Sequence, residues 1–248
     1  MDGAVLALFV ISTFVGGITT GLAGFAFGLV VSGVWLHFLT PVQTAILIAA
    51  YATVVQSYAI WKLRHALNWR KIAPLIVGSG LGVIAGVALL PYTAPAMLKL
   101  FVGVLLILYS LYGLTRPAVR ITAQGVTADL GAGFVNGLLG PLTGLAGVAV
   151  SIWVQLHDWP KDVQRSTFQP VIFAAMLMTV ISLIYAGAAT AENGRLFLLG
   201  LPPLIVGMLT GWWLYGRLDD TAFRKAILVL LLLSGLALVT PHALALVR

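Results

Sequence analysis

Two copies of one pentapeptide are the residues in this chain whose types and spacing best suit ligand binding. Residues 20–24 read Thr-Gly-Leu-Ala-Gly, and residues 143–147 repeat them. Threonine is a favoured first residue of a helix, and glycine lets a ligand approach the backbone closely. The first N–H groups of a helix lack partners within the helix and carry the positive end of its dipole. If each copy opens a half-helix, the two starts together predict an anion site. The alternative is that these glycines only pack a kinked helix tightly.

Further polar side chains lie near the start of the apolar segment that follows each copy. Gln43 follows the first copy, and Arg165 and Gln169 follow the second. A guanidinium suits an anion through its planar fork, although the same residue can instead reach the membrane interface along its apolar stem. Gln169 needs a polar partner, and the proline after it frees a carbonyl, which together favour a cavity. The candidate substrate-binding residues are Thr20, Gly21, Gly24, Gln43, Asn136, Thr143, Gly144, Gly147, Arg165 and Gln169.

The composition requires these residues to sit in a membrane. Of the 248 residues 60% are hydrophobic and 8% charged, and the mean hydropathy is +1.06. A soluble domain carries about 25% charged residues, so soluble enzymes and nucleic-acid-binding domains are excluded. No Asp, Glu, Lys or Arg occurs between Asp2 and Lys62. This uncharged stretch is far longer than the roughly 20 residues of one membrane-spanning helix. We predict an all-α polytopic membrane protein without a cofactor, a metal site or a nucleic-acid partner.

Charges and Pro/Gly breaks divide the chain into eight apolar segments: 3–39, 41–61, 72–90, 95–115, 128–156, 163–188, 196–215 and 221–239. The first would be about 55 Å long as one helix, whereas the hydrocarbon core is about 30 Å thick. Segments 3–39 and 128–156 also contain Gly and Pro near their middle, at residues 16–21 and 137–144. We therefore expect each of these two to form two short helices, joined at a tip inside the membrane.

An internal repeat supports this division. Residues 74–78, Pro-Leu-Ile-Val-Gly, recur as residues 203–207, in the same order relative to the Thr-Gly-Leu-Ala-Gly copies. We predict two repeats, 1–120 and 121–248, each a broken re-entrant hairpin followed by three transmembrane helices.

The distribution of basic residues predicts that the two repeats are inverted. If both hairpins return to their own side and the loop between 61 and 72 is cytoplasmic, only Lys99, Arg195 and Arg248 of the 14 Lys and Arg residues lie outside. If both broken segments cross instead, six lie outside. The positive-inside rule favours the first arrangement, in which both termini are outside. The start, Met1-Asp2-Gly3, has no basic residue, so we expect no cleaved signal peptide.

At these residues the chain resembles the sulfite exporter TauE/SafE family, also called TSUP transporters. The resemblance rests on the two glycine-rich broken segments and on residues 137–147 followed by Pro160, Arg165 and Ser166. It implies a carrier of small sulfur-containing anions in the bacterial inner membrane. We expect export of sulfite or a related organosulfonate, because an anion leaving a negative interior needs no coupling acid and no acidic residue lies near a membrane midplane. Ion-coupled import of thiosulfate or an organosulfonate is the alternative, and a membrane enzyme or scaffold is a remote one. The oligomeric state is not predicted.

Overall fold

The computed structural model describes residues 2–115, 125–157, 159, 161–214, 228–229, 232–233, 235–236 and 239–240. The helices that these residues form are α1 (Gly3–Ala23), α2 (Phe27–Trp35), α3 (Pro41–Leu63), α4 (Trp69–Leu89), α5 (Pro95–Thr115), α6 (Val126–Thr143), α7 (Val148–Gln155), α8 (Lys161–Tyr185) and α9 (Ala191–Leu214), with short 3-10 turns η1 (Arg64–Ala66) and η2 (Leu90–Tyr92). Each of these elements is helical. Helices suit a lipid environment because their backbone N–H and C=O groups form hydrogen bonds within the same segment. The all-α prediction is confirmed for the described residues.

Both long apolar segments are divided into two helices, as the sequence predicts. Segment 3–39 gives α1 and α2, and segment 128–156 gives α6 and α7. The position of the first break differs from the expectation. Residues 16–21 stay inside α1, and the chain leaves the helix only at Gly24. The glycines at 16, 17 and 21 do not interrupt the helix because other helices pack on them closely, so that tertiary contacts outweigh weak propensity.

The remaining boundaries agree with the sequence to within a few residues. The expected helix 95–115 is α5 without any change, while α4, α8 and α9 begin two to five residues earlier than the apolar segments 72–90, 163–188 and 196–215. The predicted segments begin at the first apolar residue, whereas these helices include polar residues before it, which explains the difference. Most of the expected helix 221–239 lies outside the described residues.

Within the described part of the chain, six helices are long and apolar enough to cross a membrane: α1, α3, α4, α5, α8 and α9. The presence of α1 in this set was not expected. With 21 residues it is a full-length span by length and composition, whereas its partner α2 has only 9 residues. The second broken segment is divided as unequally, into α6 with 18 residues and α7 with 8.

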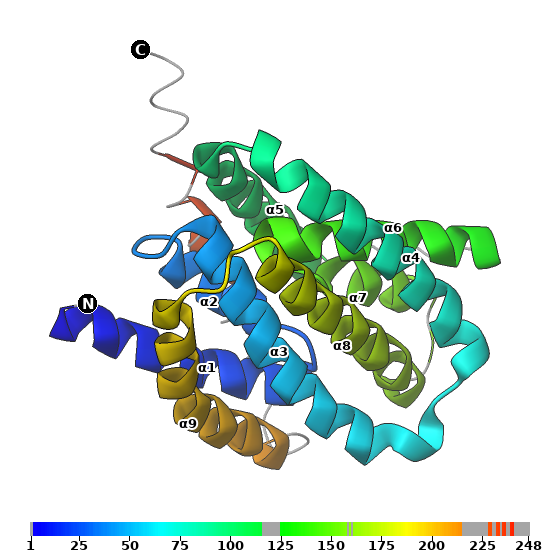
Figure 1. Cartoon of the computed structure of the whole chain (residues 1–248). Coiled ribbons are helices and arrows are strands. Elements are labelled where there is room, and N and C mark those ends of the chain that lie inside the picture. Colours follow the sequence, from blue (N-terminus) through cyan, green and yellow to red (C-terminus); the bar gives the residue numbers. More distant parts are fainter. Residues whose placement is uncertain are drawn as a thin grey trace.

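Helices from the first half of the chain pack against helices from the second half (Figure 1). Helices α3 and α8 run side by side through the middle, α1 lies beside α9, and α4 lies beside α6. Each broken segment thus packs against the other half's helix that carries the repeated Pro-Leu-Ile-Val-Gly sequence. Separate domains with their own cores are incompatible with this arrangement, because each seam needs both halves.

Glycines allow the backbones to meet closely along both seams. In α9, Gly207 and Gly211 face the carbonyls of Phe14 and Ile18 in α1. In α4, Gly78 and Gly82 face the carbonyls of Leu130 and Phe134 in α6. A Cβ at any of these glycines would clash with backbone atoms. Small residues of this kind are how membrane helices gain close packing where burial of apolar surface is no longer a driving force.

The outer faces of the bundle are apolar. Ile84 on α4, Leu108 on α5 and Leu198 on α9 are all more than half exposed. Val77 and Leu81, on the turns of α4 before Ile84, are also more than half exposed. A water-facing surface would not carry so many large apolar side chains on successive turns, but a lipid-facing surface does. The fold is therefore that of a multi-pass membrane protein.

Candidate functional site: two helix breaks that meet around a cavity

The first break follows the C-terminal end of α1. Gly24 ends the helix with φ +89, a left-handed conformation that glycine adopts without strain, and its N–H donates to Thr20 O over 2.7 Å. Helix α2 then begins at Phe27, after Ala26, which has no side chain that could cap it. Thr20 is thus the fourth-last residue of α1, and the prediction that it opens a half-helix is wrong.

The second break lies between Gly144, which ends α6 at φ +73, and Gly147, which precedes α7 at φ +124. Thr143 is the last residue of α6. Its hydroxyl donates to Leu139 O over 2.6 Å and accepts from Leu145 N–H over 3.1 Å. The prediction that Thr143 opens a half-helix is therefore also wrong, although the residue does hold the turn in place.

The two pentapeptides do not take the same conformation. In the first copy the helix ends at the last residue, Gly24, and in the second it ends at the second residue, Gly144. Either glycine could end the helix, since both copies have glycine at both places. Gly21 stays helical because it packs against Met208 O and Gly211 of α9, a contact that holds the end of α1 straight.

Asn136 holds the start of α7. Its Oδ1 accepts from the N–H of Gly147 over 2.6 Å and from the N–H of Val150 over 3.4 Å. Its Nδ2 donates to Ser79 Oγ on α4 over 3.3 Å, and Ser79 Oγ donates to Gly133 O. Asn136 is fully buried. An amide oxygen from α6 therefore already occupies part of the N-terminal end of α7, where the sequence predicts a bound anion.

Side chains from α3 and α8 contact the carbonyl groups at the end of α1. Arg165 Nη2 donates to Gly21 O over 3.2 Å, and Gln56 Nε2 donates to Gly24 O over 2.8 Å. The Arg165 guanidinium also lies 4.6 Å from the centre of the Trp212 ring, and the residue is only 7% exposed. A positive charge is favourable at a helix C-terminus and over an aromatic face. Arg165 thus lies inside the protein beside the first break rather than reaching outward as an interfacial anchor.

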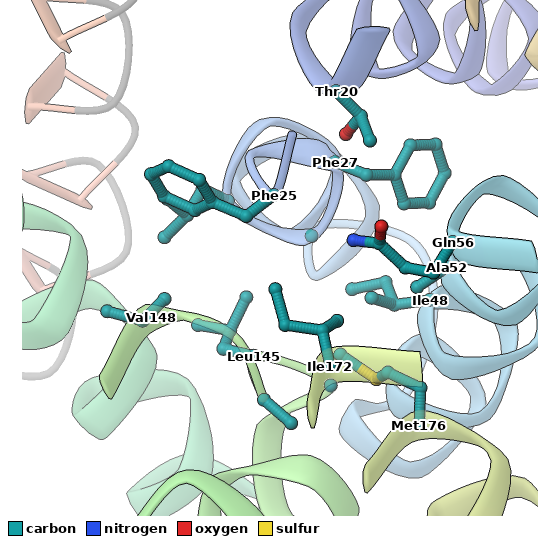
Figure 2. Close-up of a pocket in the computed structure, with 14 residues that line it drawn as sticks. Thr20, Phe25, Phe27, Ile48, Ala52, Gln56, Leu145, Val148, Ile172 and Met176 are labelled. Carbon is teal, nitrogen blue, oxygen red and sulfur yellow. The ribbon is translucent and has the colours of Figure 1, made fainter. Parts of the chain in front are cut away.

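The two breaks meet around a small cavity (Figure 2). A Cβ placed on Gly28 would lie 3.1 Å from Gly144 O, so the start of α2 touches the end of α6. The cavity has a volume of about 10 Å³, which is the room that one water molecule needs. Its walls come from both breaks, from α3 and from α8: Thr20, Phe25, Phe27, Gly28, Leu29, Ile48, Ala52, Gln56, Gly144, Leu145, Ala146, Val148, Ile172 and Met176.

Two side-chain oxygens in this otherwise apolar wall have no hydrogen-bond partner among the described residues. They are Thr20 Oγ1 and Gln56 Oε1, on side chains that are 3% and 2% exposed. Figure 2 shows the Thr20 hydroxyl and the Gln56 amide directed toward the same space beside Phe27. A buried polar atom without a partner is rare, and a ligand or water placed between these two oxygens would give both a hydrogen-bond partner.

Gln43 lies away from both breaks, whereas Gln169 lies beside the first break but outside the cavity wall. Gln43 forms a capping box with Thr40 at the start of α3: Thr40 Oγ1 accepts from Gln43 N–H, and Gln43 Oε1 accepts from Thr40 N–H. It is occupied in forming that helix, away from the cavity. Gln169 is buried beside Gly24, one turn along α8 from Arg165, but it is not in the cavity wall. Its Oε1 also lacks a partner among the described residues.

Of the ten predicted residues, the structure gathers Thr20, Gly21, Gly24, Arg165 and Gln169 around the first break and Asn136, Thr143, Gly144 and Gly147 around the second. The prediction omitted Gln56 and Ser79. Gln56 is the one Gln within the apolar stretch of α3 after its first turn, and that position in the sequence is the signal that identifies it. Ser79 lies between two glycines and gives no such signal.

Comparison with known proteins gives one family. The model of the family described as Sulfite exporter TauE/SafE matches residues 8–238, nearly the whole chain. No curated protein and no solved structure matches.

Proposed function

The chain belongs to the sulfite exporter TauE/SafE family, whose members are transporters rather than enzymes, and from this we propose that it exports sulfite or a related organosulfonate. We propose that the anion binds in the bilayer where the two helix breaks meet. The observation that supports this place is the cavity between the breaks, with two unpartnered oxygens in its wall. Breaks in membrane helices are tolerated where they line a cavity, and transporters use them to hold ions.

The groups around the cavity suit a small anion. The start of α2 contributes Phe27 and Gly28 to the wall, and the first N–H groups of a helix attract negative charge. Thr20 can donate its hydroxyl hydrogen. Arg165 supplies a positive charge next to Gly21, one residue away from Thr20. Together these provide the donors and the charge that a desolvated anion needs.

The cavity as it stands is too small for sulfite, since about 10 Å³ holds only one water molecule. We propose that this is a closed arrangement and that substrate enters when the first break, packed with α9, moves away from the second break, packed with α4. The nearest alternative function is ion-coupled import of thiosulfate or an organosulfonate. The site residues are the same for both directions, so flux measurements are needed to separate them.

Transport of sulfite is testable in proteoliposomes. With total sulfite inside and an inside-negative potential, we expect efflux to exceed that from protein-free vesicles, and to slow when the potential is collapsed, because each exported charge gains about 2.3 kcal/mol per 100 mV. Efflux that is unaffected by the protein, with thiosulfate uptake that depends on an ion gradient, would instead support the import alternative.

We also propose that the two halves are inverted repeats with both termini outside, in the inner membrane of a bacterium. The packing of α1 against α9 and of α6 against α4 supports this, as does the distribution of basic residues. The chain has no cysteine, so single cysteines can be introduced and labelled from one side. We expect a cysteine at His65, in η1, to be labelled only from the cytoplasm. One at Arg248 should be labelled only from outside. Labelling of both from the same side would contradict the inverted arrangement.

A further inference from the structure

Gln56 presents a hydrogen-bond acceptor to the cavity. Its Nε2 donates to Gly24 O over 2.8 Å. Because a carbonyl oxygen accepts and cannot donate, the nitrogen of this amide must be on the Gly24 side, and Oε1 must be on the other. That oxygen is buried and has no partner among the described residues. A ligand that completes the site therefore has to bring a hydrogen-bond donor.

A fully deprotonated oxyanion has no donor. The oxygens of sulfite or sulfate would face Gln56 Oε1 with like partial charge, at a position that is shielded from water. The desolvation energy of an ion also rises with the square of its charge, so a dianion is far harder to bring into an apolar wall than a monoanion. Both effects disfavour the dianions.

On the premise of the proposed function, we infer that the site binds a monoanion that keeps one O–H group, and that for this family's substrate class the ion is hydrogensulfite. Gln56 Oε1 accepts from its O–H group. Thr20 Oγ1 and the first N–H groups of α2 donate to its charged oxygens. Thr20 and Gln56 come from different helices, α1 and α3, so the position of the end of α1 relative to α3 sets the distance between these two groups.

Two ligands that differ in one group test this inference. Methanesulfinate has the charge and shape of hydrogensulfite, with a methyl group in place of the hydroxyl. Calorimetry on the purified full chain at a pH one unit below the pKa of hydrogensulfite should show at least about tenfold tighter binding of hydrogensulfite, because an acceptor left unpaired by the analogue is costly. Raising the pH to one unit above that pKa should weaken the apparent affinity for total sulfite by about tenfold, in proportion to the monoanion. Sulfate should not compete.

Two variants test whether Gln56 causes the preference for hydrogensulfite over methanesulfinate. Gln56→Met should reduce the ratio of the two affinities to about one, and a ratio measured on one protein is insensitive to a general loss of stability. Thr179→Val is the matched control, because its hydroxyl is also buried without a partner among the described residues but is not in the cavity wall. It should keep the wild-type ratio.

The outcomes separate the two proposals. Equal binding of methanesulfinate and hydrogensulfite, or affinity that rises with pH, would overturn this inference and leave the proposed function standing. A protein that binds no sulfur anion at either pH would overturn the proposed function itself. If Gln56→Met does not fold, two measurements on the wild-type protein still test the inference: hydrogensulfite against methanesulfinate, and the affinity for total sulfite at the two pH values.

Discussion

Gly137→Ala should lower the free energy of unfolding by roughly 1–3 kcal/mol, although only one methyl group is added. Gly137 lies in α6 where that helix meets α4, and an alanine Cβ would run into Ser79 O and the backbone atoms beside it. The obstacle is backbone rather than the end of a flexible side chain. The two helices must separate to make room, and the hydrogen bond from Asn136 to Ser79 is lost with the separation. The measurement is the melting temperature of the purified protein.

Gly131→Ala is the matched control for this prediction. It lies in the same helix, but nothing is within 4 Å of the position that its Cβ would take. Because alanine is a better helix former than glycine by about 1 kcal/mol, this variant should melt at the wild-type temperature or slightly above it. A Gly131→Ala protein that is as unstable as Gly137→Ala would mean that glycine is needed in α6 for a reason other than close packing with α4.

The sequence predicts the architecture well because membrane residence leaves few choices. Apolar runs longer than the bilayer is thick must break, and the runs 3–39 and 128–156 do break. The repeated Pro-Leu-Ile-Val-Gly likewise identifies α4 and α9, which both use glycines to pack against a broken segment. Length, composition and repetition are properties that the chain carries locally, so they can be read before the structure is known.

The local details of the breaks could not be predicted, since they depend on contacts between halves. Gly21 and Gly144 occupy the same place in identical pentapeptides, but only Gly144 ends a helix. The difference arises from α9, which packs on Gly21. Similarly, nothing in the sequence around Asn136 shows that its amide oxygen reaches Gly147 and Val150, 11 and 14 residues later. The two identical pentapeptides predict equal roles at the two breaks, but in the fold their roles differ.

That difference leads to unequal effects of the same substitution in the two copies. Thr143→Val removes a hydroxyl that donates to Leu139 O and accepts from Leu145 N–H, so it should lower the free energy of unfolding by about 1–2 kcal/mol. Thr20→Val removes a buried hydroxyl with no partner among the described residues, so ligand-free stability should stay the same or rise. Valine and threonine are both β-branched and similar in helix propensity, so the backbone is not a source of the difference.

The response to ligand should show the opposite order. If the Thr20 hydroxyl donates to the anion in the cavity, Thr20→Val should lose most of the thermal stabilisation that hydrogensulfite gives, because the variant leaves a charged oxygen without its donor. Thr143→Val should melt earlier without ligand but gain nearly the full stabilisation with it, since Thr143 is not in the cavity wall. The measurement is the melting temperature of each variant with and without hydrogensulfite. Equal losses of ligand response in both variants would indicate a symmetric site in which both breaks bind the anion directly. An unchanged response in Thr20→Val would show that this hydroxyl does not donate to the anion.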